Sequence, residues 1–278
     1  MRISPVLLIA LIAKIGTVNV NAQADADANN TADDEKAQEA DLVKKTLNPV
    51  ASLVSVPIQN NWDFNIGPAD AMRYTANVQP VIPVTLNQNW NLISRTILPF
   101  IYQESRFAGD GSHSGMGDTV QSLFLSPKDA VGGWILGGGP ALLFPTATDS
   151  ALGAGKWGAG PTAVVLRQDN GFTYGVLANH IWSYAGWGNR EVSATFIQPF
   201  FAYSTRTFTT FVVNTESTYD WQARQWSVPL NFQVTQLLKV GRQPISLQLG
   251  YRYYAEGPSG GPDWGLRFAV TLLFPKKG

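Results

Sequence analysis

Six charged residues occupy polar positions of stretches that otherwise alternate between apolar and polar side chains. If the apolar side chains face one way, the charged ones face the other way and share an interior. Opposite charges in a narrow passage would filter solutes by size and charge. The alternative, which the sequence leaves open, is that they pair only to satisfy buried charge. The candidate constriction residues are Arg73, Arg95, Glu216, Asp220, Arg252 and Arg267. Their expected polar neighbours are Asn77, Gln79, Asn214, Asn231, Gln233 and Gln248.

Enzymatic chemistry has few candidate residues. Only His113 and His180 could activate a serine, and no motif places a serine beside His180. His113, between Ser112 and Ser114, is more simply a loop residue. His180 shares a parity with Trp182 and Tyr184, a position suited to attack on outer-leaflet lipid, although an interfacial histidine is the more ordinary interpretation. We therefore expect no catalytic residues and no enzyme activity. A barrel-borne outer-membrane lipid hydrolase is the alternative.

Metal and cofactor sites are not indicated. The chain has no cysteine, which removes thiolate metal sites. Glu104, Asp110 and Asp118 lack the regular spacing of a Ca²⁺ loop. The sequence contains no GxxxxGK[ST] phosphate-binding loop. We expect no metal and no cofactor, so any transport would be passive diffusion down a gradient.

The elements that must position the charged residues are clearest at the end of the chain. Apolar and polar residues alternate strictly from Ile245 to Tyr254, and after a turn-rich segment the pattern resumes from Trp264 to Phe274. This pattern predicts a β-hairpin. Each arm is as long as the roughly 9–11 residues with which a tilted strand crosses a bilayer. Because an open apolar edge would recruit other chains, the last strand must be paired.

Comparable stretches recur from Leu53 onward and predict twelve strands. The strands are Leu53–Ile66, Arg73–Leu86, Asn89–Gln103, Asp118–Ser126, Gly133–Pro145, Lys156–Arg167, Gly171–Tyr184, Val192–Ser204, Thr207–Trp221, Gln225–Leu238, Gln243–Ala255 and Asp263–Phe274. Most expected outer loops are longer than the inner turns, with Gln222–Arg224 as the exception. Short periplasmic turns, longer outer loops and two aromatic girdles are typical of outer-membrane barrels.

Composition agrees with residence in a membrane. Charged residues make up 14% of the 278 residues, against roughly 25% in typical soluble domains. Lys plus Arg equals Asp plus Glu at 20 each, so no nucleic-acid partner is expected. The uncharged candidate for a spanning helix, Ala130–Thr148, is too rich in glycine and proline for a helix interior. The predicted fold is therefore all-β: an antiparallel up-and-down transmembrane β-barrel of about 12 strands.

Three regions follow along the chain. Residues 1–24 are predicted to be a signal peptide, with a short apolar core at Val6–Ala13. Residues 25–48 are acidic and predict a disordered or short helical segment. A helix over Ala37–Leu47 could dock in a barrel lumen or merely lead into the first strand. Residues 49–278 are predicted to form the transmembrane β-barrel.

Two observations leave alternatives open. Prolines 80, 83, 99, 161, 199 and 229 lie inside predicted strands, where a missing N–H removes a ladder bond, so they sit at bulges or the strands are shorter. Alternation also does not say whether the apolar face meets lipid or a soluble core. A soluble periplasmic β-domain with a binding or structural role is the second alternative.

Several motifs resemble one family. They are Asn48–Leu53, Pro80–Pro83, Trp90–Arg95, Phe144–Thr148, Gly155–Pro161 and Tyr253–Pro258. Together they are similar to the MetA-pathway-of-phenol-degradation family of exported bacterial proteins, over about residues 47–276. The resemblance implies an outer-membrane transporter barrel linked to uptake of aromatic or other small hydrophobic compounds. It supplies no binding or catalytic residues.

The expected function is a porin-like channel for passive diffusion of small, aromatic or hydrophobic molecules. The expected location is the bacterial outer membrane of a Gram-negative cell, reached through export by the signal peptide. Outer-membrane lipid and a small-molecule solute are the expected partners. The barrel-assembly machinery is expected to insert the protein.

Overall fold

A computed structural model describes residues 26–275, so the predicted signal peptide at 1–24 lies outside the described residues. The chain divides into two compact units, one ending at Gln38 and one beginning at Glu39. The described part of the first unit belongs to helix α1 (Ala26–Thr46), which continues into the second unit. Residues 25–48 are thus helical over most of their length. No helix among the described residues is both long and apolar enough to cross a membrane.

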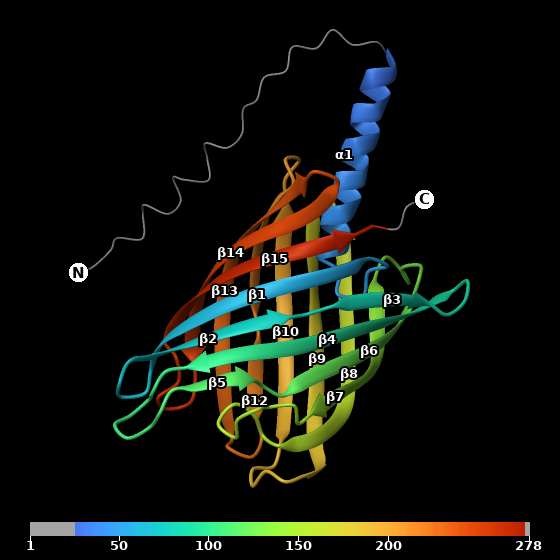
Figure 1. Cartoon of the computed structure of the whole chain (residues 1–278). Helices are drawn as coiled ribbons and strands as arrows, with labels where there is room; N and C mark the ends of the chain where they lie inside the picture. Colours follow the sequence, from blue (N-terminus) through green and yellow to red (C-terminus); the bar gives the residue numbers. More distant parts are fainter. Residues whose placement is uncertain (1–25, 276–278) are drawn as a thin grey trace, which may run out of the picture. The chain divides into compact units, whose positions relative to one another are not determined.

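The second unit contains a closed antiparallel β-barrel (Figure 1). Its strands are β1 (Val54–Ile66), β2 (Ala71–Val78), β3 (Val81–Thr85), β4 (Trp90–Gln103), β5 (His113–Met116), β6 (Thr119–Pro127), β7 (Ile135–Phe144), β8 (Lys156–Asp169), β9 (Phe172–Gly186), β10 (Ser193–Ser204), β11 (Thr209–Thr215), β12 (Ser217–Asp220), β13 (Gln225–Val240), β14 (Gln243–Glu256) and β15 (Trp264–Phe274). The pairs β2 and β3, β5 and β6, and β11 and β12 each make one barrel strand in two pieces. The barrel therefore has twelve strands, and the predicted fold is confirmed.

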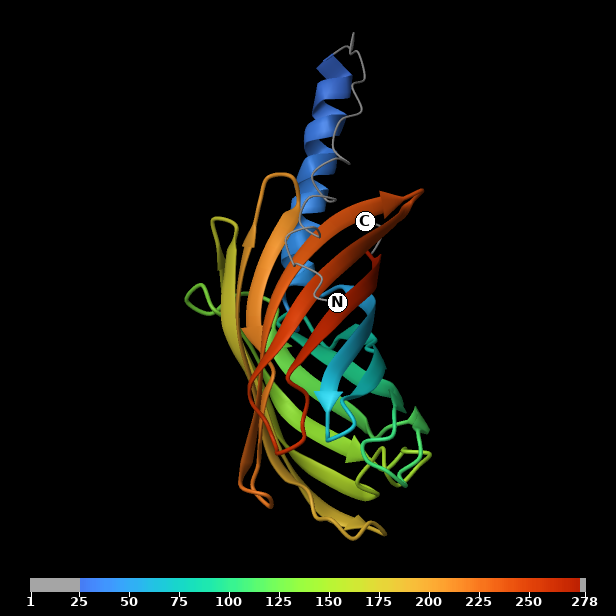
Figure 2. The same cartoon turned by 90° about the vertical axis from the view of Figure 1, so that its left-hand side faces the viewer.

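Closure depends on the last hairpin that the sequence predicted. β14 and β15 pair from Ile245 opposite Leu272 to Tyr253 opposite Trp264. β15 then pairs with β1, with Phe274 opposite Val54. Figure 2 shows β14, β15 and β1 running side by side. The chain consequently enters and leaves the barrel at the same end, and no apolar edge is left unpaired.

Most of the strand breaks lie at prolines. Pro80 separates β2 from β3, and Pro99 faces the gap between β5 and β6, where its carbonyl accepts the N–H of Gly117. The register that pairs Thr215 with Leu230 and Thr218 with Ser227 places Pro229 opposite Glu216, between β11 and β12. A proline cannot donate to the ladder, so each break is where a backbone bond is lost. Prolines 83, 161 and 199 stay inside strands β3, β8 and β10.

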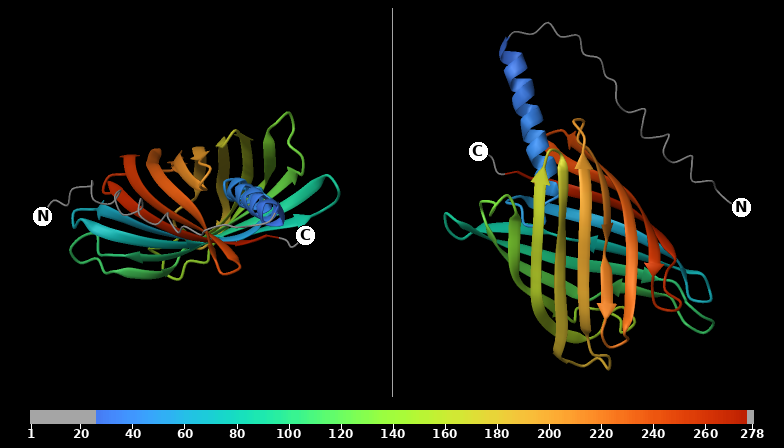
Figure 3. Two further views of the ribbon diagram at one scale, coloured as in Figure 1. Left: turned by 90° about the horizontal axis from the view of Figure 1, so that it is seen from above. Right: turned by 180° about the vertical axis from the view of Figure 1, so that it is seen from behind.

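The two faces of the barrel wall differ in chemistry. Leu249 is 44% exposed and Phe232 is 50% exposed on the outer face, while Asn231, the residue before Phe232, is fully buried inside. Figure 3 shows, in the view from behind, the part of the barrel wall from β8 to β13. Asn231 and Phe232 belong to β13. A soluble β-domain would need the apolar residues inward. The structure places them outward, as a lipid-facing wall requires.

Exposed aromatic residues border both ends of the barrel. Those near the outer loops are Tyr102, Trp157, Trp182, Tyr184, Trp221, Trp226 and Tyr253. Those near the inner turns are Trp90, Trp134, Phe172 and Phe274. Aromatic rings with a polar edge favour the headgroup level of a bilayer. The two groups therefore mark the expected lipid interfaces of a transmembrane barrel.

Candidate functional site

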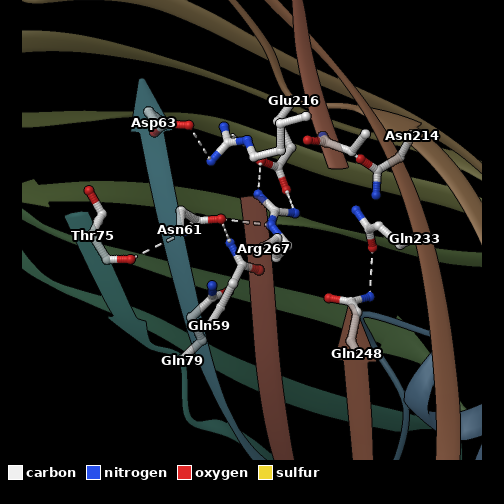
Figure 4. Close-up of polar contacts among 12 residues, drawn as sticks. Gln59, Asn61, Asp63, Thr75, Gln79, Asn214, Glu216, Gln233, Gln248 and Arg267 are labelled. Atoms are coloured by element: carbon white, nitrogen blue, oxygen red, sulfur yellow. Dashed lines mark hydrogen bonds and ion pairs between the residues drawn. The ribbon is translucent and has the colours of Figure 1, made fainter. Parts of the chain in front are cut away.

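An ion pair between Glu216 and Arg267 lies inside the barrel (Figure 4). Arg267 on β15 donates from Nη1 and Nη2 to the two carboxylate oxygens of Glu216, at 2.8 and 2.7 Å. Its Nε donates to Oδ1 of Asn61 on β1, at 2.7 Å. Arg267 is only 3% exposed. Two parallel hydrogen bonds between a guanidinium and a carboxylate are among the strong, orienting contacts of proteins.

Arg252 on β14 extends this ion pair toward β1. Its guanidinium nitrogens lie 3.8 Å from a Glu216 oxygen and 3.5 Å from Oδ1 of Asp63. The Tyr254 hydroxyl donates to the same Asp63 oxygen at 3.0 Å. Arg252 Nε is buried and has no hydrogen-bond partner among the described residues. Residues far apart in sequence are therefore joined across the interior, with one donor left unsatisfied.

Two further arginines line the same interior without a carboxylate partner. Arg95 on β4 donates to Oε1 of Gln79 at 2.9 Å and interacts electrostatically with Glu216. Arg73 on β2 donates from Nε to Oε1 of Gln103 at 2.6 Å. Neither makes an ion pair within the described part of the chain. We define the polar cluster as Asp63, Arg73, Arg95, Glu216, Arg252 and Arg267. Four arginines and two carboxylates leave it two positive charges in excess.

Amides continue the polar side of the lumen on the neighbouring strands. Asn231 donates to Asn214 at 2.7 Å, and Gln248 donates to Gln233 at 2.6 Å. Oδ1 of Asn231 and Nε2 of Gln233 are buried without a partner among the described residues. Unpaired polar atoms of this kind favour contact with water or a solute.

The opposite side of the lumen is apolar, which the sequence did not predict. We define the apolar wall as Ile93, Phe124, Val164, Leu166, Leu177 and Phe200, on strands β4, β6, β8, β9 and β10. Ile93 and Phe124 are register partners and both are fully buried. The next inward-facing pair toward the outer end is Arg95 with Ser122. The apolar wall thus begins one inward-facing position below Arg95.

The chain before β1 fills the inner end of the lumen. We call residues Glu39–Leu53 the inner segment. Its Val50 is 4% exposed and packs against the apolar wall. Its Val43 packs with Leu237 and Leu273 at the inner ends of β13 and β15. Hydrogen bonds from Asn91 to Ser52 and from Gln168 to the carbonyl of Lys44 add polar contacts.

Gly137 on β7 makes room for Val50. A Cβ at this position would lie 2.9 Å from Cγ1 of Val50 and 3.1 Å from Cγ1 of Val164. Carbon atoms do not approach so closely without displacement. The glycine therefore lets the inner segment seat against the wall.

The structure places the six predicted constriction residues at two levels. Arg95, Glu216, Arg252 and Arg267 meet around the Glu216 carboxylate, and Arg73 lies at the edge of this group beside Asp63, its register partner. Asp220 lies four residues beyond Glu216, about 13 Å along a strand. There it pairs with Arg190 and lines an outer cavity of about 840 Å³. Asp220 is therefore separate from the polar cluster.

Asp63 and Asn61 were missed from the sequence. Gln59, Asn61 and Asp63 alternate with Trp62 and Phe64 in β1. This alternation was a usable signal for an inward face. Asn60 obscured it, since a polar residue on the outer parity makes both faces of the strand resemble each other. In the structure Asn60 accepts a hydrogen bond from the Tyr74 hydroxyl and does not face the lumen, as Asn61 and Asp63 do.

The lipid-facing histidine has hydroxyl neighbours. His180 Nδ1 lies 2.7 Å from Oγ1 of Thr195, and His180 Nε2 lies 3.5 Å from Oγ of Ser193. The Trp221 indole N–H donates to the same Thr195 hydroxyl at 2.8 Å. A serine is thus near His180, but at a distance that makes a weak hydrogen bond.

An ionic contact between the start of β5 and an outer loop predicts a pH dependence. His113 Nδ1 lies 2.8 Å from Oδ2 of Asp149. The pKa of His113 is raised above its ordinary 6.5, first by Asp149 and then by Asp110. The pKa of Asp149 is lowered below 3.8, first by the N–H of Ala151 and then by His113. We expect the ion pair to be fully formed between pH 3.8 and pH 6.5, the ordinary pKa values of the two groups. It is lost as pH rises through the raised pKa of His113 or falls through the lowered pKa of Asp149.

NMR titration of His113 measures this directly. Asp149→Asn should lower the pKa of His113 toward its ordinary value, while His180 keeps its titration unchanged. A His113 pKa at or below 6.5 in the unmodified chain would contradict the contact.

Comparison with solved structures agrees with the fold. The chain is similar to the COG4313 outer membrane channel from Pseudomonas putida F1, with 15% identity, a TM-score of 0.64, and coverage of 80% of this chain and 96% of that chain. It is also similar to outer membrane phospholipase A from Escherichia coli, with 12% identity, a TM-score of 0.43, and coverage of 87% and 98%. No protein-family model and no curated protein matches the chain. At these identities the likeness concerns the barrel fold alone. It fits the outer-membrane transporter family that the motifs resemble, without confirming that family by name.

Proposed function

We propose that this protein is an outer-membrane channel through which small solutes diffuse passively. The observation that carries the proposal is the polar cluster, which lies inside a barrel whose outer face is apolar. Charges held around Glu216 by side chains from β4, β14 and β15 are placed as a constriction would be. If these charged residues served only to neutralise each other, the numbers of arginines and carboxylates would match. The polar cluster instead has two arginines in excess, and Nε of Arg252 has no partner among the described residues.

The apolar wall supports small aromatic or hydrophobic molecules as solutes. Ile93 and Phe124 would contact such a molecule if it took the place of Val50, whereas a wholly polar lumen would offer no such contact. Passive diffusion requires no energy-coupling site, and we propose that the protein is not an enzyme. Insertion into the outer membrane would need its lipid and the barrel-assembly machinery as partners.

Conductance in a planar lipid bilayer tests the proposal. Detergent-extracted protein that migrates in a heat-modifiable way on gels is a folded barrel, and we expect it to give discrete current steps. A folded barrel that never conducts, even after the inner segment is displaced by mutation, would refute the channel.

A lipid hydrolase is the second candidate because Ser193 lies near His180 on the lipid-facing side. The group on the other ring nitrogen is a threonine hydroxyl, whereas a hydrolytic triad uses a carboxylate or amide to orient its histidine. The test is phospholipid hydrolysis by the purified protein and by His180→Ala. Activity that is present and lost in this variant, together with absent conductance, would favour the hydrolase.

A further inference from the structure

Positive charge and apolar surface adjoin each other in the lumen. Arg95 lies one inward-facing position from Ile93 on β4, a step of about 6.6 Å. Ser122 and Phe124 repeat this step on β6. A solute that spans the step would meet a guanidinium at one end and the apolar wall at the other. Both environments are thus within reach of one small molecule.

The positive charge at this step is only partly neutralised by Glu216 and Asp63, which face four arginines. Arg95 is bound only to the amide of Gln79 among the contacts of the described residues, and an amide oxygen carries no net charge. Arg252 is 8% exposed, and its Nε lacks a partner. A buried guanidinium with free donors favours an anion, because a charge-assisted hydrogen bond satisfies both groups.

The apolar wall accepts an aliphatic group in this structure. The side chain of Val50 packs with Ile93, Phe124 and Val164, and Gly137 leaves the room that Val50 fills. The isopropyl group of Val50 occupies the place that the apolar part of a solute would take. A solute that displaced Val50 would therefore find an apolar half beside the cationic half.

Acidic residues at the outer entrance do not cancel this preference. Asp220 pairs with Arg190, and Glu191 pairs with Lys156. Asp118 accepts the backbone N–H groups of Ala147 and Ala154. Each of these carboxylates is engaged in the outer cavity, whereas the arginine excess lies at the polar cluster.

We propose that the lumen binds organic anions that carry one carboxylate and a compact apolar body, with the carboxylate at Arg95 and Arg252 and the apolar body on the apolar wall. This rests on the proposed channel function and names the class of solute. A neutral analogue would leave the guanidinium groups unsatisfied. An anion without an apolar body would gain nothing from the wall. Selectivity therefore requires both halves of one molecule.

Titration calorimetry with three probes tests the proposal on the detergent-extracted, full-length folded barrel. Benzoate carries both halves, benzamide is its neutral analogue, and acetate lacks the apolar body. We expect benzoate to bind at least about tenfold more tightly than benzamide, the low end of what a charge-assisted hydrogen bond contributes. We also expect it to bind at least about tenfold more tightly than acetate, because burial of its ring adds apolar contact. Equal binding of benzoate and benzamide, or of benzoate and acetate, would overturn the proposal.

Arg95→Gln should weaken benzoate binding about tenfold and leave benzamide unchanged. Arg206→Gln is the matched control, because Arg206 is exposed in an inner turn away from the lumen. Arg95→Lys serves if the glutamine variant does not fold, and it should retain the preference for the anion with lower affinity. Unchanged benzoate affinity in the folded Arg95→Gln variant would contradict the site.

Bilayer recordings separate this proposal from the channel itself. A barrel that conducts KCl but binds benzoate and benzamide alike refutes only the anion class. A barrel that binds benzoate through Arg95 but never conducts refutes only the channel.

Discussion

Glu216→Gln is expected to destabilise the barrel more than any other single neutralisation of its lumen charges. The variant leaves Arg267, which is 3% exposed, without its bidentate carboxylate partner. Breaking a buried ion pair from one side costs about 3–5 kcal/mol, because a buried charge is left uncompensated. Arg252 loses an attractive contact at the same time. Urea unfolding in detergent or lipid, followed by tryptophan fluorescence, measures the free energy of unfolding.

The double variant Glu216→Gln with Arg267→Gln should recover part of this lost stability, because removing both charges leaves no unpaired charge at position 267. Arg190→Gln is the matched control. It breaks the exposed pair of Arg190 with Asp220, and exposed pairs contribute about 0–1 kcal/mol. If Glu216→Gln and Arg190→Gln lower stability equally, the Glu216 carboxylate is well hydrated and the polar cluster is not a buried network.

Val50→Asp is expected to open the inner end of the lumen and raise the conductance severalfold. Val50 is 4% exposed against the apolar wall. A carboxylate placed there without a partner costs several kcal/mol, so the inner segment should leave its seat. The barrel ladder does not include Val50, and the strands should remain paired. Single-channel current in a planar bilayer measures the change.

Ala40→Asp is the control for this variant, because Ala40 is exposed in the same inner segment and gains the same charge. Its conductance should equal that of the unmodified chain. Equal conductance in Val50→Asp would mean that the inner segment does not restrict the lumen.

The sequence predicted the barrel because the period-2 pattern is strong where one face meets lipid. The hairpin at Ile245–Phe274 shows this, since each outward residue is apolar and most of the residues between them are small or polar, Leu273 being the exception. Loop lengths and aromatic positions added evidence about orientation. These signals all derive from the outer face, which the bilayer constrains along every strand.

The lumen was less predictable because the bilayer does not constrain its composition. In β4 both Leu92 and Ile93 are apolar, and only the fold shows that Ile93 faces inward. The polar cluster joins β1, β2, β4, β14 and β15 with Glu216, which lies between β11 and β12. Sequence parity gives the face of a residue but not its partner. Asp220 shares its inward parity with Glu216 but lies four residues farther out, where it meets Arg190.

Prolines carried information that the sequence alone left ambiguous. Pro229 lies inside a predicted strand, and the register places it opposite Glu216. The break between β11 and β12 at this point is therefore a consequence of a missing N–H on the neighbouring strand. The sequence gives the position of Pro229 but not the register of the two strands, which is what sets it opposite the break.

Accessibility of adjacent positions on β14 tests most directly whether the polar side of the barrel is the solute path. The chain has no cysteine, so a single introduced thiol is the only reactive one. Gln248 bonds inside the lumen to Gln233, and Leu249 is 44% exposed on the outer face. A cationic methanethiosulfonate reagent added during bilayer recording should reduce the current through Gln248→Cys and leave that through Leu249→Cys unchanged. Unchanged current in a modified Gln248→Cys channel, or block at Leu249→Cys instead, would contradict a solute path through the lumen.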